Sequence, residues 1–437
     1  MQKIYQDRRN RLMTSLGAGV LVLPGARLTI RNSDVHHSFR QDSDFFYLTG
    51  FDEPASCLIL SHDGNGKTES ILLVPPKNKE KEIWDGYREG VEGVVKNYGV
   101  DLGYSNEELS EVLFQKLEGH KTLFFDFDRD SKTDKIIHEV LLRFKTLKRK
   151  NPVFPRKIQF FKDELGEMRH CKSSQEVEMF KQCAEVTRQA NEAVMKALKP
   201  GMYEYEIEAI LEYEYKRRGG THGYGHIVAG GYNATCLHYH DNNQKLEAGT
   251  ILLIDSGCEL PHKFTADVTR CYPVDGKFPK KIREIYEIVL EANKRAIAKC
   301  VVGSSIREVH REAQRVLAMG LVKLGVLSGE ADTLIENGEL GKFYMHGTSH
   351  WLGMDVHDVG RYDEPDGTAV LFREGMMLTI EPGLYFRKEY SGIDTPYEGI
   401  GIRIEDDVLI GANGPVVLTS SIPKEVGEIE AIMSGKQ

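Results

Sequence analysis

Apolar and polar positions along the first third of the chain follow two different periods. Short apolar runs predict strands, and these runs lie at residues 20–23, 57–60, 71–74 and 123–127. Apolar residues spaced three and four positions apart predict helices, at residues 107–118 and 134–147. Strands that alternate with helices are typical of an α/β domain. We therefore predict an α/β N-terminal domain, which we assign to residues 1–165.

Longer segments with helical spacing dominate the rest of the chain, residues 166–437. Ser173 and Glu176 form a capping-box sequence at the start of a helix that should end near Leu198. Helical spacing continues at residues 204–218, 280–300 and 306–324. β-type runs lie between and after these helices, so we predict an α+β C-terminal domain.

An internal repeat divides this second region. Residues 249–257 and 375–383 both read glycine, five mostly apolar residues, a carboxylate, one residue and glycine. Two further pairs of matching segments flank them, 201–207 with 303–309 and 267–270 with 403–406. These matches, which occur in the same order in both halves, indicate a duplicated unit with a pseudo-two-fold relation. Such a relation would bring the acids of both halves together.

Composition narrows the class of protein. The 437-residue chain has a formal net charge of −9, which argues against a nucleic-acid binder with a basic surface. No apolar run approaches the ~20 residues that span a bilayer. Seven cysteines occur without a CxxC pair, which favours a reducing compartment over a disulfide framework. We expect a cytoplasmic protein with neither a membrane nor a nucleic acid as partner.

Four carboxylates lie on or beside apolar strands of the repeat: Asp255, Asp267, Glu381 and Glu405. Burial of an isolated carboxylate is costly, so four acids in one place require positive charge. Ion pairs with Arg270 and Arg403 would neutralise two of them. A pair of divalent metal ions would neutralise all four.

A histidine-rich stretch at residues 346–358 adds nitrogen donors. It contains His346, His350 and His357, and a polar surface loop is the alternative interpretation. Oxygen donors with one imidazole suit manganese, cobalt or zinc. Two such ions about 3.5–4 Å apart can share a water, lower its pKa and polarise a carbonyl. A metal-activated water and a polarised carbonyl are what hydrolysis of an amide bond requires.

Several motifs resemble those of the M24 metallopeptidases, and in particular the aminopeptidase P branch of that family. The matching segments are 31–34, 40–45, 253–259, 266–270, 346–353, 356–360, 381–383 and 401–406. The resemblance implies an aminopeptidase P-type N-terminal domain at 1–165. It also implies a pita-bread (creatinase/methionine aminopeptidase-like) catalytic domain at 166–437.

The resemblance implies five metal ligands: Asp255, Asp267, His350, Glu381 and Glu405. Asp267 and Glu405 would bridge two ions, and Glu381 would also accept a proton from the nucleophilic water. The usual activator in this family is Mn²⁺, with Co²⁺ or Zn²⁺ as alternatives.

The resemblance also implies roles around the ligands. His238 and His357 match histidines that contact substrate, and His346 matches a supporting histidine. Arg403 would hold carboxylates in place. Trp84 matches an aromatic residue that an oligomer, a dimer or tetramer, can lend to a neighbouring subunit's site.

The activity implied is hydrolysis of the N-terminal Xaa-Pro bond by a metal-bridging hydroxide, which releases the first residue from peptides with proline in second position. Three alternatives remain open. The first is a prolidase that cleaves Xaa-Pro dipeptides only, the second a metal-free binding module that kept the fold, and the third a metal-independent creatinase-type hydrolase.

One departure from the family pattern concerns the first two ligands. Asp255 and Asp267 are separated by twelve positions, where the family commonly has eleven. A turn can absorb one extra residue, whereas a strand would turn its side chains to the other face. We therefore expect the extra residue in the turn at 260–264.

Overall fold

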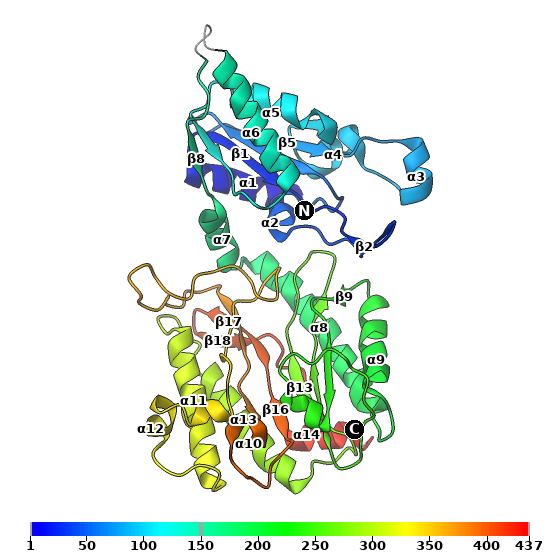
Figure 1. The fold of residues 1–437 in the computed structure, drawn as a ribbon, viewed down its shortest axis with the longest axis vertical. Coiled ribbons are helices and arrows are strands. Elements are labelled where there is room, and N and C mark those ends of the chain that lie inside the picture. Colours follow the sequence, from blue (N-terminus) through cyan, green and yellow to red (C-terminus); the bar gives the residue numbers. More distant parts are fainter. Residues whose placement is uncertain (1, 148–151, 436–437) are drawn as a thin grey trace. The chain divides into compact units, whose positions relative to one another are not determined.

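The computed structural model describes residues 2–147 and 152–435. The chain divides into two compact units, Met1–Met168 and Arg169–Gln437 (Figure 1). Within the described residues, no helix has both the length and the apolar content that a membrane span requires.

The first unit is built on a six-stranded mixed sheet with the order β6-β5-β4-β1-β7-β8. Its strands are β1 (Gly19–Pro24), β4 (Cys57–His62), β5 (Thr68–Val74), β6 (Leu102–Ser105), β7 (Thr122–Phe124) and β8 (Lys157–Gln159). β1 pairs antiparallel with β4 and parallel with β7. The strand predicted at 123–127 is shorter and ends at Phe124; a turn follows at Asp128, whose φ is +70°.

Helices flank this sheet. They are α1 (Gln2–Leu16), α2 (Ser43–Thr49), α3 (Lys79–Asp85), α4 (Gly90–Tyr98), α5 (Leu109–Leu117) and α6 (Ser131–Thr146), and a short hairpin is formed by β2 (Ile30–Asn32) and β3 (Val35–His36). Leu113 of α5 and Val140 of α6 share a buried apolar cluster with Val20 and Ile59 of the sheet. This packing confirms the predicted α/β character. α7 (Lys162–His170) spans the division between the two units.

Two helix pairs and two three-stranded sheets are the main elements of the second unit, with α9 and α11 on opposite sides of the strands in Figure 1. The helices are α8 (Ser174–Ala197), α9 (Glu204–Lys216), α10 (Lys280–Ile297), α11 (Ile306–Lys323), α12 (Ala331–Glu336), α13 (Lys388–Ser391) and α14 (Val426–Met433). The capping box of Ser173 and Glu176 begins α8 as predicted.

Each helix pair is followed by its own sheet. The first sheet contains β10 (Ile227–Gly230), β11 (Ile251–Asp255) and β13 (Thr269–Pro273), and the second contains β14 (Met377–Ile380), β17 (Asp406–Gly411) and β18 (Gly414–Val417). Two-stranded ribbons join β9 (Thr221–His222) to β12 (Cys258–Glu259) and β15 (Gly383–Tyr385) to β16 (Gly401–Arg403). The order helices, then sheet, occurs twice, which confirms the predicted duplication.

The two halves meet where β16 lies beside β13. The Glu405 amide donates to the Thr269 carbonyl at 3.1 Å, and the Asp267 amide donates to Asp407 Oδ2 at 3.1 Å. β16 also packs against residues 231–235 of the first half, where a Cβ on Gly401 would lie 2.0 Å from the Ala234 carbonyl oxygen. This contact between the two halves, called the joint below, therefore places acids of both halves side by side.

A tight turn separates the first two predicted ligands. The Leu260 amide donates to the Phe264 carbonyl at 3.3 Å, and Lys263 adopts a φ of +67°. At the base of this hairpin, a Cβ on Gly257 would lie 1.6 Å from the Ala266 oxygen, so only glycine fits. As predicted, residues 260–264 form a turn, which is where one additional residue is tolerated without a change of strand register.

Candidate metal centre

The four predicted acids come from strand ends on both sides of the joint. Asp255 ends β11, and Asp267 lies two residues before β13. Glu381 directly follows β14, and Glu405 lies between β16 and β17. Asp267 and Glu405 are buried, and the other two are half-buried. The structure thus brings together all four acids that the sequence singled out.

His350 joins these acids from the histidine-rich stretch, which runs beside β14. The Thr379 amide donates to the His350 carbonyl at 3.0 Å, and the Glu381 amide donates to the Thr348 carbonyl at 2.8 Å. These bonds hold His350 Nε2 at 3.2 Å from Asp267 Oδ2 and 3.7 Å from Glu381 Oε1. The backbone pairing therefore aims the imidazole at the carboxylates.

The electrostatics of this cluster favour a cation. Burial raises the pKa of Asp255 and Glu405, and it raises the pKa of Glu381 to about 7. Three acids with raised pKa values cannot all be ionised cheaply without added positive charge. One donor atom each from Asp267, His350 and Glu405 lie within 4.8 Å of one another. Carboxylates with one imidazole form a donor set that fits divalent metal ions.

The two arginines considered as ion-pair partners behave differently. Arg403 Nη2 lies 2.5 Å from Asp255 Oδ2, while its Nε donates to Thr269 Oγ1 at 2.9 Å. Arg270 pairs instead with Asp406, at 2.8 Å. Ion pairing with arginine therefore accounts for one of the four acids, and the positive charge for the others has to come from elsewhere.

Tyr224 is a site residue that the sequence did not reveal. Its hydroxyl contacts Asp255 Oδ1 at 2.7 Å and also Asp267 Oδ1. Burial and both carboxylates raise the pKa of this phenol well above its usual range, so it stays a hydrogen-bond donor. Tyr224 therefore connects two acids of the first half. Its only sequence signal is two flanking glycines, Gly223 and Gly225.

Asp407 is a second residue beside the cluster that the sequence did not reveal. Its Oδ2 accepts the hydrogen bond from the Asp267 amide, and its buried Oδ1 has no hydrogen-bond partner among the described residues. Burial and the Asp267 carboxylate raise the pKa of Asp407. This residue supports the backbone that carries Asp267.

The other predicted histidines surround His350 at different depths. The His357 ring is exposed, with its centroid 4.2 Å from that of His350. His346 Nε2 lies 2.9 Å from the Tyr385 hydroxyl, and burial lowers the pKa of His346 to about 3, so its imidazole is neutral. Burial, above all, lowers the pKa of His357, and His238, which is exposed, lies near enough to interact electrostatically with both His346 and His357. These three rings therefore border the metal cluster.

Trp84 belongs to the other unit of the chain. It lies on α3, and its side chain is 87% exposed. Ile83 and Tyr87 beside it are exposed as well. The three residues form an apolar surface on the first unit.

Comparison with known proteins defines the class. Residues 178–412 match Metallopeptidase family M24, and residues 5–124 match the aminopeptidase P N-terminal domain. The chain belongs to the M24 metallopeptidase family, whose divalent metal ions agree with the donor set described above. It is a hydrolytic enzyme with the aminopeptidase P type of two-domain architecture.

Similar proteins match over the full length of the chain. The Xaa-Pro aminopeptidase of Haemophilus influenzae is 38% identical over 98% of this chain and 97% of its own, and that of Escherichia coli is 37% identical with the same coverage. Zinc-substituted E. coli aminopeptidase P in complex with product superimposes with a TM-score of 0.96 at 36% identity, covering 100% of this chain and 99% of that one. Both domains are therefore shared with these relatives.

Proposed function

We propose that this chain removes the N-terminal residue from peptides whose second residue is proline, by metal-dependent hydrolysis of the Xaa-Pro bond. The observation that carries the proposal is the set of acids and one histidine at the joint of an M24 fold. The relatives that carry the name Xaa-Pro aminopeptidase match this chain along nearly their whole length. That agreement favours the aminopeptidase over a prolidase restricted to dipeptides.

Two divalent metal ions would be held by Asp255, Asp267, His350, Glu381 and Glu405. Asp267 and Glu405, the two buried acids, would bridge the ions. Once bound, such ions polarise the scissile carbonyl and lower the pKa of the attacking water. We propose Mn²⁺ as the activating metal, with Co²⁺ and Zn²⁺ as alternatives, because oxygen donors with one imidazole accept all three.

Glu381 would act as the proton acceptor. Its carboxyl has a pKa near 7 in the metal-free protein, and the positive charge of bound metal would keep it ionised near neutral pH. An ionised carboxylate beside the nucleophilic water can take its proton and return it to the leaving amine. Glu381 Oε1 lies 3.7 Å from His350 Nε2, and its Oε2 lies 3.6 Å from His346 Nδ1.

The surrounding histidines would contact the substrate or support the site, and Arg403 would orient a metal ligand. His238 and His357 are exposed beside the cluster, so their N–H groups can reach a peptide carbonyl and its developing negative charge. His346, neutral and bonded to Tyr385, would support the wall of the site. Arg403 would fix the orientation of Asp255 through its ion pair.

Trp84 would act in an assembly. An exposed tryptophan flanked by Ile83 and Tyr87 is an unusual surface for a monomer. We propose a homo-oligomer, a dimer or tetramer, in which Trp84 borders the site of a neighbouring subunit.

We also propose a cytoplasmic location. The free state of all seven cysteines is compatible with it.

The test is an assay of chelated protein refilled with Mn²⁺, Co²⁺ or Zn²⁺. Xaa-Pro-Xaa tripeptides and Xaa-Pro dipeptides are compared as substrates at equal concentrations. We expect release of the first residue from the tripeptide at least as fast as from the dipeptide. Cleavage of the dipeptide alone would identify a prolidase, and failure of every metal to restore activity would refute the hydrolase.

A further inference from the structure

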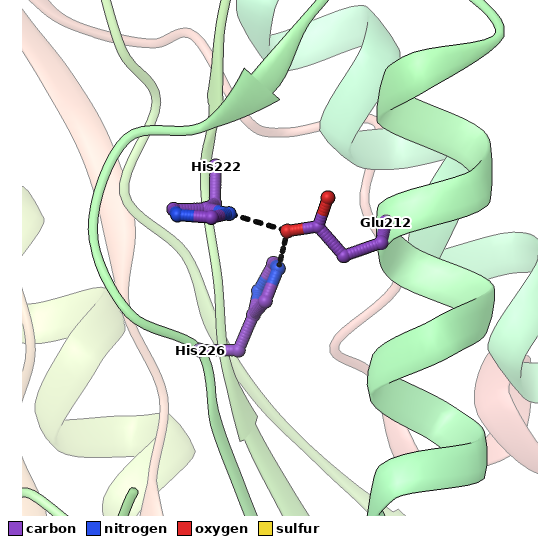
Figure 2. A group of neighbouring side chains, drawn as sticks. All are labelled: Glu212, His222 and His226. Carbon is purple, nitrogen blue, oxygen red and sulfur yellow. Dashed lines mark hydrogen bonds and ion pairs between the residues drawn. The ribbon is translucent and has the colours of Figure 1, made fainter. Parts of the chain in front are cut away.

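A second cluster of metal-ligating side chains lies outside the centre described above (Figure 2). Glu212 lies on α9, His222 ends β9, and His226 directly precedes β10. Glu212 Oε1 contacts His222 Nδ1 and lies 2.9 Å from His226 Nε2. Both imidazoles point one nitrogen at the same carboxylate oxygen, as Figure 2 shows.

The donor set is that of a zinc-type site. The three ligand atoms lie within 4.8 Å of one another. Two histidines and one glutamate are sufficient protein ligands for Zn²⁺, with a fourth position left to water. Glu208 and Glu259 add negative charge near His222. The negative charge of Glu212 is therefore reinforced by its neighbours, and the site attracts a cation.

His226 is held in the orientation that such a site requires. Its ring is buried, and its Nδ1 lies 2.8 Å from Ser256 Oγ. Ser256 Oγ in turn lies 2.7 Å from the Tyr215 hydroxyl. A hydrogen bond on one ring nitrogen fixes the tautomer and aims the other nitrogen at a metal. The buried ligand is thus oriented from behind, while His222 and Glu212 leave the site open to solvent.

We propose that Glu212, His222 and His226 bind a third divalent transition-metal ion of the zinc class, separate from the catalytic pair. On binding, the ion displaces the protons that now link the two imidazoles to Glu212. The competing description is an ion-paired cluster that binds no metal, and the experiment below distinguishes the two.

The position of this site connects it to the metal centre. The segment from His222 to His226 carries Tyr224, whose hydroxyl contacts Asp255 and Asp267. An ion held by both histidines anchors this segment on either side of Tyr224. The third ion would therefore stabilise the loop that presents Tyr224, without contacting substrate.

The experiment uses the Mn²⁺-loaded full-length protein, equilibrated with Zn²⁺ and then freed of unbound metal. Elemental analysis counts manganese and zinc separately, so exchange at the catalytic pair is recognised. We expect one more metal ion per chain in the wild type than in His222→Asn or Glu212→Gln. His222 is 48% exposed, so its replacement leaves the fold intact. The matched control is His138→Asn, an exposed histidine on α6.

A second readout is thermal unfolding of the same Mn²⁺-loaded proteins. Added Zn²⁺ should raise the Tm of the wild type and of His138→Asn, because a ligand of the folded state stabilises it. The same addition should leave His222→Asn unchanged. Equal metal content in wild type and His222→Asn would overturn the proposal, as would an equal Tm shift. Neither result bears on peptide hydrolysis, which is assayed independently.

Discussion

Arg403 and Asp255 form an ion pair across the joint between the two halves of the catalytic unit, with Nη2 and Oδ2 2.5 Å apart. Arg403 comes from β16 of the second half, and Asp255 ends β11 of the first. The same guanidinium donates to Tyr385 and Thr269, at 3.1 and 2.9 Å. Its planar fork thus fixes the carboxylate that one metal ion would use.

Arg403→Lys tests this positioning. Lysine keeps the positive charge but loses the fork that reaches three partners at once. We expect affinity for the activating metal to fall by about 10–100-fold, the usual cost of losing a group that orients a ligand. The measurement is activity against free Mn²⁺ concentration. Arg315→Lys, in an exposed pair with Asp332, should behave as wild type; unchanged metal affinity in Arg403→Lys would contradict the role.

Tyr224→Phe removes one hydroxyl that contacts two acids. The half-buried ring keeps its place, so stability should change little. Asp255 and Asp267 lose their shared donor, and we expect metal affinity to fall by roughly 10-fold or more. Excess Mn²⁺ should restore most of the activity. Tyr213→Phe, an exposed tyrosine on α9, serves as the control, and equal losses in both variants would argue against Tyr224.

Glu381→Gln keeps the shape of the side chain but cannot accept a proton. We expect kcat to fall by about 10²–10⁴-fold, the range lost with a general base. The variant also replaces a ligand, so metal content is measured beside kcat. A near-normal kcat at full metal occupancy would show that the proton goes elsewhere.

Metal-free protein should lose stability as the pH rises. Burial raises the pKa of Glu381 from 4.5 to about 7, so its contribution is present below pH 4.5 and is lost as the pH approaches 7. Burial lowers the pKa of His350, but Asp267 and Glu381 more than offset this and raise it from 6.5 to about 9. The contribution of His350 is therefore complete below pH 6.5 and is lost through pH 9.

Urea unfolding of chelated protein measures this effect. Between pH 6.5 and 9 we expect a loss on the order of 2 kcal/mol attributable to His350, from the size of its pKa shift. His350→Asn should flatten the dependence in this range. Mn²⁺-loaded protein should show the opposite trend, because metal binding to deprotonated ligands strengthens with pH. A flat profile for chelated wild type would contradict the coupling.

Trp84→Ala tests the proposed assembly. The side chain is exposed in the single chain, so its removal should leave the unfolding midpoint unchanged. If Trp84 borders a neighbour's site, kcat/KM should fall by roughly 10-fold or more, as for a buried aromatic contact at an interface. Size-exclusion chromatography records whether the oligomer persists. Tyr390→Ala, exposed on α13 of the second unit, is the control. An unchanged kcat/KM and an unchanged oligomer size in Trp84→Ala would show that Trp84 has no role in a neighbour's site.

The convergence of the acids could be predicted because local sequence determines where each of them lies. Asp255 and Glu381 each follow an apolar strand and precede a glycine by two positions. The strand ends therefore carry the acids to the same place in both halves. The turn at 260–264 could be anticipated for a similar reason, since strand register tolerates an extra residue only outside the strands.

Tyr224 and Asp407 could not be predicted, because their roles depend on which surfaces meet. Asp406 and Asp407 are adjacent in β17, so their side chains face opposite sides. One pairs with Arg270 and the other with the Asp267 amide. The sequence indicates the alternation but not which face meets the other half. Glu212 likewise lies ten residues from His222, and only the packing of α9 on β9 brings them into contact.

The duplicated architecture makes the catalytic unit an intramolecular dimer. The first half contributes Asp255 and Asp267, and the second contributes the remaining proposed ligands, so neither half holds a complete set. The joint also carries the Arg403–Asp255 pair. A chain severed in the exposed turn at 275–277 would give two fragments that regain the ligand set only by re-associating. Binding of metal and association of the two halves are therefore thermodynamically coupled, because each stabilises the other.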